Sequence, residues 1–261
     1  MKVHIITAAN RALYGEMLAG MHRQRHALFV ETYQWSALQS VDGLEIDEYD
    51  DEHAVYFLAI EDDQLFGSFR MLPAWRRSLT KDRFAHFVTT EPLPVEPDTW
   101  EWTRWVPGPL SRPRDLIRSR RALFLASLEF AASRGVVSYA AVCDLRCAGE
   151  LEELGWSPRP LGMPTPYPEG VAVAIRWPVE PGLLGATRRL FRHPWAASFE
   201  APAPADPEIA DAGPSPTQIA AMLSLRGPQA LAEIDCTLDR WRAPAPASRG
   251  HLHRMIIEGN A

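Results

Sequence analysis

Two polar segments in the first fifty residues could bind a charged substrate. In RHALFVETYQW, Arg25 and Phe29 are four residues apart and Trp35 follows. On a helix, the guanidinium and the ring would share one face and form a cationic corner with aromatic walls. The alternative is that Phe29 and Trp35 are core residues while Arg25 extends to solvent, and this segment alone favours that alternative.

The second segment is EIDEYD, in which Asp47 and Asp50 flank Tyr49 shortly before an expected strand. These carboxylates could hold an ammonium group or a metal ion, or could simply be solvated. A metal is least favoured, because a calcium loop needs more oxygen ligands at set spacing and a glycine at its bend. We predict no metal site, and taken alone the segment indicates a solvated acidic loop.

Two strands carry the remaining candidates. Arg70 lies among apolar residues in LFGSFRML, and a buried charge of this kind needs an anionic partner. The segment WEWTR offers one: alternation places Glu101 and Thr103 on one strand face and Arg104 on the other, with Trp100 and Trp102. Because this strand stops at PGP, a bulge there would re-aim Glu101 or Arg104, as bulges often do beside active sites.

A mixed α/β framework is needed to position these groups. Apolar periodicity predicts strands at 3–7, 53–60, 64–72, 100–106, 136–143 and 170–177, the last of them being the final strand. It predicts helices at 11–31, 114–134 and 145–154. The acidic turn at residues 61–63 indicates that the second and third strands form an antiparallel hairpin.

Composition limits the class of protein. The chain has 261 residues, 46% of them hydrophobic and 23% charged, which excludes disorder throughout. A net charge of -6 argues against a nucleic-acid binder. Three cysteines without CxxC spacing suit a reducing compartment, and no apolar run is long enough for a membrane span or a signal peptide. We therefore expect a cytoplasmic protein.

The amino-acid composition changes near residue 200. Residues 1–199 have the composition of a folded domain, and residues 200–216 are rich in proline, alanine and acid, which predicts a linker. Residues 217–261 contain two short apolar stretches that predict a small helical extension of unknown role.

Taken in order, the chain contains R-x3-F-x5-W, E-I-D-x-x-D, G-x-x-R-x-x-P, Phe84 and W-E-W-T-R, and later ELEELGWSPRPLGMP. Each motif is weak alone, but the ordered set resembles the acyl-homoserine-lactone (autoinducer) synthase family over roughly residues 3 to 180. The resemblance implies an α/β fold related to the N-acetyltransferases, with a mixed sheet whose splayed central strands admit the arm of an acyl carrier, helices on its faces and a C-terminal extension.

The resemblance also implies a reaction. An acyl thioester acylates the amine of S-adenosylmethionine, and lactone closure then expels methylthioadenosine. The product is an N-acyl-L-homoserine lactone, a quorum-sensing signal. Both reactants are substrates, so we expect no cofactor.

Each part of that reaction has a candidate residue. The attacking amine must lose a proton to a carboxylate, and Glu101 fits this role, with neighbouring tryptophans raising its pKa and the nearby arginines lowering it. Further catalytic candidates are Arg104, Arg70, Asp47 and Asp50. The residues implied for S-adenosylmethionine binding are Arg25, Phe29, Trp35 and Phe84, which offer charge pairing and aromatic stacking.

The acyl donor has two sets of candidate residues. Position in the sheet suggests an acyl pocket lined by Trp102, Thr103, Val142 and Cys143. The basic run at Arg112, Arg114, Arg118, Arg120 and Arg121 suits an acidic acyl carrier protein or the phosphates of coenzyme A, and equally a solvated helix face. Cys143 stands where family members with 3-oxo products have threonine, and Thr103 replaces a serine.

Two other functions compete with the synthase. One is a general N-acetyltransferase-like enzyme that transfers an acyl group from acyl-CoA to another amine, although VPGPLSRPRD lacks the G-x-G phosphate loop that such enzymes use. The other is a binding module that acts through residues after 217. The sequence leaves open the acyl chain, the donor and the oligomeric state.

Overall fold

The computed structural model describes residues 1–35, 38, 40–108, 112–167 and 170–204. Within them, a nine-stranded mixed sheet has the order β11-β1-β4-β5-β6-β7-β10-β8, with β9 beside β10. The strands of this sheet are β1 (Lys2–Ile6), β4 (Val55–Glu61), β5 (Gln64–Pro73), β6 (Thr99–Pro107), β7 (Ser138–Asp144), β8 (Arg159–Pro160), β9 (Thr165–Tyr167), β10 (Gly170–Pro178) and β11 (Ser198–Phe199).

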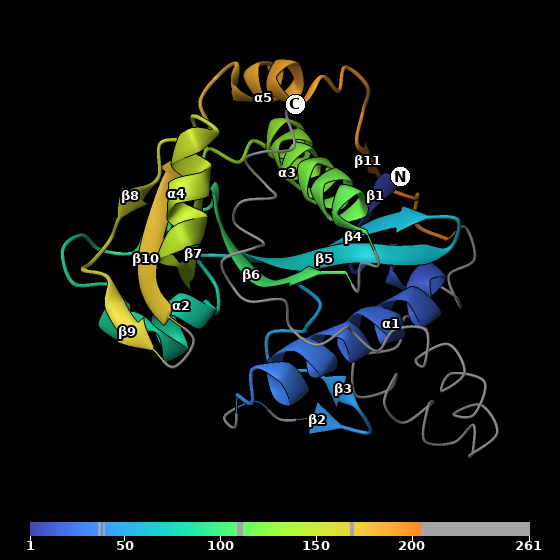
Figure 1. Cartoon of the computed structure of the whole chain (residues 1–261), viewed down its shortest axis with the longest axis horizontal. Helices are drawn as coiled ribbons and strands as arrows, with labels where there is room; N and C mark the ends of the chain where they lie inside the picture. The colour runs from blue at the N-terminus through green and yellow to red at the C-terminus, as the bar shows by residue number, and fades with distance from the viewer. Residues whose placement is uncertain (36–37, 39, 109–111, 168–169, 205–261) are drawn as a thin grey trace.

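A small hairpin and several helices complete the fold (Figure 1). The hairpin is formed by β2 (Ser40–Val41) and β3 (Leu44–Glu45). The helical segments are η1 (Arg11–Tyr14), α1 (Gly15–Arg25), η2 (His26–Thr32), α2 (Leu79–Arg83), η3 (Ala85–Phe87), α3 (Pro113–Arg134), α4 (Leu145–Glu153) and α5 (Leu183–Phe191).

The central strands diverge, as predicted. β6 runs parallel to β7, but the two pair only from Thr99 to Glu101. Beyond that point, β6 stays with β5 while β7 stays with β10. The mixed sheet with splayed central strands is therefore confirmed, and so is the antiparallel hairpin of β4 and β5.

Helices cover the two faces of the sheet (Figure 1). On one face, α3 packs against strand residues that include Phe57, Phe69 and Trp102. On the other, α1 packs against Tyr56, Leu58 and Leu72. Because strand side chains alternate, Arg70 and Leu72 of β5 point toward α1. Their cross-strand partners Thr103 and Glu101 lie on the same face.

The predicted helix over 11–31 is confirmed as a helical segment, but its pitch changes along its length. The segment begins as a 3₁₀ turn, continues as α1 and widens into the π-helix η2. The amide of Tyr33 donates to the carbonyl of Leu28, which shows the wider i to i+5 spacing at its end. Apolar periodicity identifies a helical segment but does not resolve such changes of pitch.

The C-terminal part of the described chain also corrects a prediction. β10 was expected to be the last strand, but α5 and β11 follow it, and β11 pairs parallel with β1. No helix in the described ranges combines the length and hydrophobicity needed to cross a membrane. The predicted extension at 217–261 and most of the predicted linker lie outside the described residues.

Candidate active site

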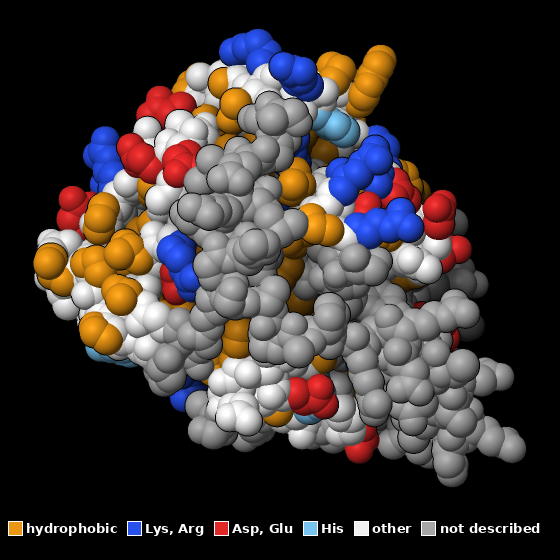
Figure 2. Space-filling model, viewed as in Figure 1, with side chains coloured by type: hydrophobic (Ala, Val, Ile, Leu, Met, Phe, Trp, Pro, Cys, Tyr) orange, Lys and Arg blue, Asp and Glu red, His pale blue; other side chains and the backbone are white. Residues whose placement is uncertain are grey.

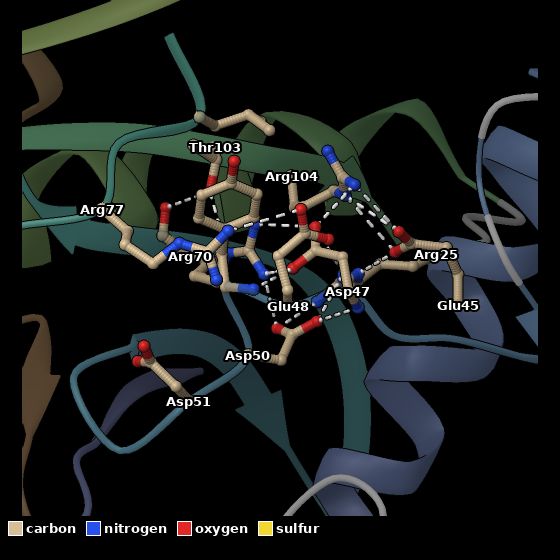
Figure 3. A network of polar contacts seen from close by, with 12 residues as sticks. Arg25, Glu45, Asp47, Glu48, Asp50, Asp51, Arg70, Arg77, Thr103 and Arg104 are labelled. Atoms are coloured by element: carbon tan, nitrogen blue, oxygen red, sulfur yellow. Dashed lines mark hydrogen bonds and ion pairs between the residues drawn. The ribbon is translucent and has the colours of Figure 1, made fainter. Parts of the chain in front are cut away.

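Three arginines and three carboxylates form one buried network beside the α1 face of the sheet (Figure 3). The arginines come from the end of α1, the middle of β5 and the middle of β6. The carboxylates come from β3 and from the loop that leads to β4. Its members are Arg25, Arg70, Arg104, Glu45, Asp47 and Asp50. Charges of opposite sign thus alternate through the network.

Arg25 is 1% exposed, so the expectation that it extends to solvent was wrong. Its Nη1 and Nη2 donate to the two oxygens of Asp50 at 2.8 and 2.9 Å, and its Nε donates to Glu45. Asp50 is also buried, and Asp47 is largely so, which excludes the simple solvated loop. The bidentate contact fixes the orientation of the guanidinium as well as its charge.

Arg70 is fully buried and has partners other than the predicted one. Its Nη1 and Nη2 donate to Asp47 at 2.5 and 3.0 Å, and Nη1 lies 2.7 Å from Asp50. Its Nε donates to the Thr103 hydroxyl at 3.0 Å. Glu101 is therefore not its counter-ion, because the acidic loop, distant in sequence from both strands, supplies two carboxylates.

Arg104 is turned into the network by the bulge that we expected in this strand. The register of β5 and β6 shifts between Ser68 and Arg70, and Arg104 has a φ of +54°. Its Nη2 donates to Glu45 at 2.9 Å and to Asp47 at 2.6 Å. Strict alternation would have placed Arg104 on the α3 face, so the extra residue is what brings it to the acids.

The pKa values of the three carboxyl groups are lowered, which favours their charged forms. Burial by itself raises the pKa of Asp50, but Arg25 and Arg70 outweigh it and hold that pKa well below its ordinary value. Burial likewise raises the pKa of Glu45, and Arg25 and Arg104 reverse the shift. The pKa of Asp47 is lowered chiefly by Arg70 against the same effect of burial. Three positive charges balance three negative ones, so the network is close to neutral.

Aromatic rings border the network on the side of η2. Phe29 stacks on Trp35 with ring centroids 5.1 Å apart, and the Arg104 guanidinium lies 5.7 Å from the Phe29 centroid. The amide of Trp35 donates to the carbonyl of Phe29 at 2.9 Å, which fixes the backbone that carries the indole. Phe84 packs instead with His86 and Phe87. The structure thus brings Phe29 and Trp35 to the network and puts Phe84 beside η3.

Glu101 is 1% exposed and lies on the same sheet face as Arg70, but it contacts α2. The amides of Leu79 and Thr80 donate to its two oxygens at 2.9 and 2.7 Å, and the Thr80 hydroxyl donates to one of them. Burial raises the pKa of Glu101, and these hydrogen bonds lower it only in part, so the pKa remains above its ordinary value. A raised carboxylate pKa is the condition expected for a general base.

Comparison with known proteins places this chain in a family. A family model described as autoinducer synthase matches residues 10–182. This chain belongs to the autoinducer synthase family. Among curated relatives of this synthase, the isovaleryl-homoserine lactone synthase of Bradyrhizobium diazoefficiens is 33% identical over 168 residues, which cover 62% of this chain and 73% of the relative. An acyl-homoserine-lactone synthase of Pseudomonas aeruginosa is 26% identical over 178 residues, which cover 67% of this chain and 86% of the relative.

Solved structures agree with this assignment. A CoA-dependent acyl-homoserine lactone synthase, BjaI, with SAM and isopentyl-CoA, matches with a TM-score of 0.71 and 28% identity, covering 80% of this chain and 97% of that one. A second CoA-dependent synthase, MesI, matches with a TM-score of 0.66 and 29% identity, covering 77% and 99%. The synthase therefore shares their fold.

The residues suggested for the acyl pocket of this synthase do not share one face of the sheet. Trp102 and Cys143 pack in the core beneath α3. Thr103 faces the network, and Val142 packs against the small core of η3 and β10. On the α3 side, the rings of Trp105, Phe124, Tyr139, Trp156 and Trp177 surround Trp102. An aromatic wall therefore borders the place where β6 leaves β7.

The basic run at the start of α3 is largely paired within the synthase. Arg118 binds Glu61 and Asp115, Arg120 pairs with Glu150, and Arg121 lies over the Phe191 ring. Arg112 and Arg114 are exposed. Basic side chains also gather over α5 at the top of Figure 2, where Arg188 and Arg189 occupy its last turn.

Sequence reasoning missed two residues that the structure of the synthase makes prominent. Glu45 stands in the quoted EIDEYD segment, yet it contacts both Arg25 and Arg104. Charge balance could have identified it, because three buried arginines require three carboxylates. Thr80 carried no signal, since its role depends on α2, a five-residue helix that apolar periodicity did not predict.

Proposed function

We infer that this chain is an acyl-homoserine-lactone synthase. It transfers an acyl group from a thioester to the amine of S-adenosylmethionine, and lactone closure then releases methylthioadenosine. Membership of the autoinducer synthase family supports this reaction over a general N-acetyltransferase. The observation that carries it in the structure is the neutral network of three arginines and three acids, which lies on the same sheet face as a buried glutamate.

The network suits the charges of S-adenosylmethionine. That molecule carries a carboxylate, an α-amine and a sulfonium, so it needs partners of both signs in one place. Arg25 and Arg104 are suited to its carboxylate, and Asp47 and Asp50 to its cationic groups. The stacked Phe29 and Trp35 can pack against the adenine or face the sulfonium.

Glu101 is the proposed base for the acyl transfer. The α-amine can attack a thioester only as a free amine, so its proton must move to a nearby acceptor. The buried carboxylate of Glu101 can take that proton directly or through one water. Its raised pKa makes it a stronger base than a solvated glutamate.

We propose coenzyme A as the carrier of the acyl group. Two relatives of known structure are described as CoA-dependent. In this chain Arg118 and Arg120 bind acids of the same fold, while Arg112 and Arg114 remain exposed and suit phosphates better than a wide acidic protein surface. Beyond Glu101, the β6 edge has no β7 partner and can receive the amides of a pantetheine arm.

We also propose a compact acyl group. The aromatic wall around Trp102 closes the α3 side of the splay, so a short branched or aryl chain suits it better than a long flexible one. The curated relative named for isovaleryl supports the same size. The two substrates supply the whole chemistry in this proposal, with no cofactor.

The test is release of methylthioadenosine from S-adenosylmethionine in the presence of an acyl donor. Short branched and aryl acyl-CoA thioesters are expected to give turnover, and the same acyl groups on carrier protein much less. If no methylthioadenosine were released with any acyl donor, whatever its length or carrier, the synthase assignment would be rejected. A preference for carrier protein would reject only the choice of donor.

Glu101→Gln tests the base. The variant keeps the shape of the side chain and should stay folded, but we expect at least about a hundredfold loss of turnover, the usual contribution of a general base. Glu153→Gln is the matched control, because Glu153 is an exposed residue of α4. Wild-type turnover by Glu101→Gln would show that another group accepts the proton.

A further inference from the structure

The contacts of Glu101 come from a single short segment. Ser78 is the N-cap residue of α2, and its side chain accepts from the amide of Lys81. The next residues donate to Glu101: Leu79 through its amide, and Thr80 through both its amide and its hydroxyl. Thr80 and Ser78 are fully buried. A buried threonine hydroxyl directed at the proposed base has no role in the reaction described so far.

We propose that Thr80 is a positioning residue for Glu101, whose hydroxyl fixes the carboxylate and favours its charged form. This inference rests on the proposed role of Glu101 as the base. A valine at position 80 would fill the same volume and keep the amide contact, yet it would remove the hydroxyl donor. The hydroxyl is therefore the part of Thr80 that can be tested separately.

Two effects compete at Glu101. Burial raises the pKa of Glu101, because a carboxylate is costly to ionise away from water. The Thr80 hydroxyl is the largest opposing effect, followed by the Ser78 hydroxyl and the two amides. A base whose pKa rose too far would be protonated at working pH, so Thr80 keeps Glu101 available.

Few charges face Glu101 from the neighbouring elements. Its strand partners are Leu72 on β5 and Ala140 on β7. The charged side chains on those strands and on β10 are Arg70, paired with Asp47 and Asp50, Asp144, paired with Arg146, and Arg176, paired with Glu91. On α2, Asp82 accepts from Tyr49, and Arg83 binds Glu48; the remaining charge there is Lys81. The Thr80 hydroxyl is thus the contact whose loss affects the carboxylate most directly.

The experiment is the pH dependence of kcat/KM in the full-length enzyme, compared for wild type, Thr80→Val and Thr80→Ser. Thr80→Val should move the acidic limb of the profile upward by about one pH unit, the size expected for a hydrogen bond to a charged group. Thr80→Ser keeps a hydroxyl and should leave the limb near its wild-type position. Thr80→Cys, with its weak S–H donor, should give an intermediate shift and serves if the valine variant does not fold.

Two results would overturn the inference: a Thr80→Val limb that stays in place while the rate falls at every pH, or equal shifts for valine and serine. Either would mean that Thr80 only supports α2. Failure of the two proposals on which it rests is recognised separately. If Glu101 were not the base, Glu101→Gln would retain its turnover, and if the chain were not a synthase, the wild type would release no methylthioadenosine. A limb that is absent in Glu101→Gln and displaced in Thr80→Val supports both proposals.

Discussion

At the scale of single residues, the network depends on every member. Each acid contacts at least two arginines, and each arginine contacts at least two acids. Removing one partner would leave buried charges without compensation, which typically costs about 3–5 kcal/mol. The network also depends on neutral groups that position its members, and His22 is the clearest example.

His22 holds the strand that carries Glu45. Its Nδ1 lies 2.9 Å from the carbonyl oxygen of Glu45, and since a carbonyl can only accept, Nδ1 must carry the hydrogen. Burial lowers the pKa of His22 from 6.5 to about 4. The ring is therefore neutral beside Arg25, which keeps the network balanced.

This shift predicts a pH dependence of stability. Between pH 6.5 and pH 4 the unfolded chain binds a proton at His22 that the folded protein does not, so the free energy of unfolding falls as pH falls. The full effect is at most about 3 kcal/mol. His22→Asn retains an amide donor and cannot titrate. Urea unfolding at pH 7 and pH 4 should show a smaller loss for the variant. Equal losses would mean that His22 is charged in the folded protein.

At the scale of elements, β6 places Glu101 and Thr103 on one sheet face and turns Arg104 toward the same face through a bulge. Its sequence only partly indicates this arrangement. Alternation correctly predicted that Glu101 and Thr103 share a face, and the stop at PGP correctly indicated a bulge. Which residue the bulge would turn could not be predicted, because it depends on the register with β5. The partners of Arg70 were missed for a related reason: pairing with a loop far away in sequence leaves no periodic signal.

The end of β6 makes a testable contact with β5. A Cβ at Gly108 would clash with the carbonyl carbon of Phe66, which is backbone and cannot swing away. Gly108→Ala should therefore push the strands apart and destabilise the protein by about 1–3 kcal/mol. Gly149→Ala on α4 is the matched control, because nothing lies within 4 Å of its added Cβ, and a gain of up to about 1 kcal/mol is expected. Equal stability of both variants in urea would contradict the close approach.

At the scale of the whole molecule, the site lies within the first 204 residues. The family match ends at residue 182, and the described chain beyond it adds α5 and β11. Glu129 of α3 accepts from the amides of Ala197 and Ser198, which fastens β11 to the body of the protein. Asn10 donates to the carbonyl of Ala201 in the same region. The sequence predicted a boundary near residue 200 from composition, but not these anchors, which depend on a distant helix.

We propose that residues after 204 are dispensable for catalysis. A chain ending at residue 204 keeps the network, Glu101 and both anchors of β11, so its methylthioadenosine release should stay within about twofold of wild type, a change of less than about 1 kcal/mol. A chain ending at residue 194 loses β11 and should unfold at a lower temperature. Lost activity in the chain ending at residue 204 would place part of the catalytic machinery in the C-terminal segment.

The balanced network has a consequence for the choice of ligand. Its arginines and acids already satisfy one another, so an incoming molecule must displace existing ion pairs. A ligand with only an anionic or only a cationic group would free one member and leave its former partner unmatched. A zwitterionic ligand returns one charge of each sign for every pair that it separates. We therefore propose that the network selects zwitterionic amino-acid ligands over simple acids and simple amines.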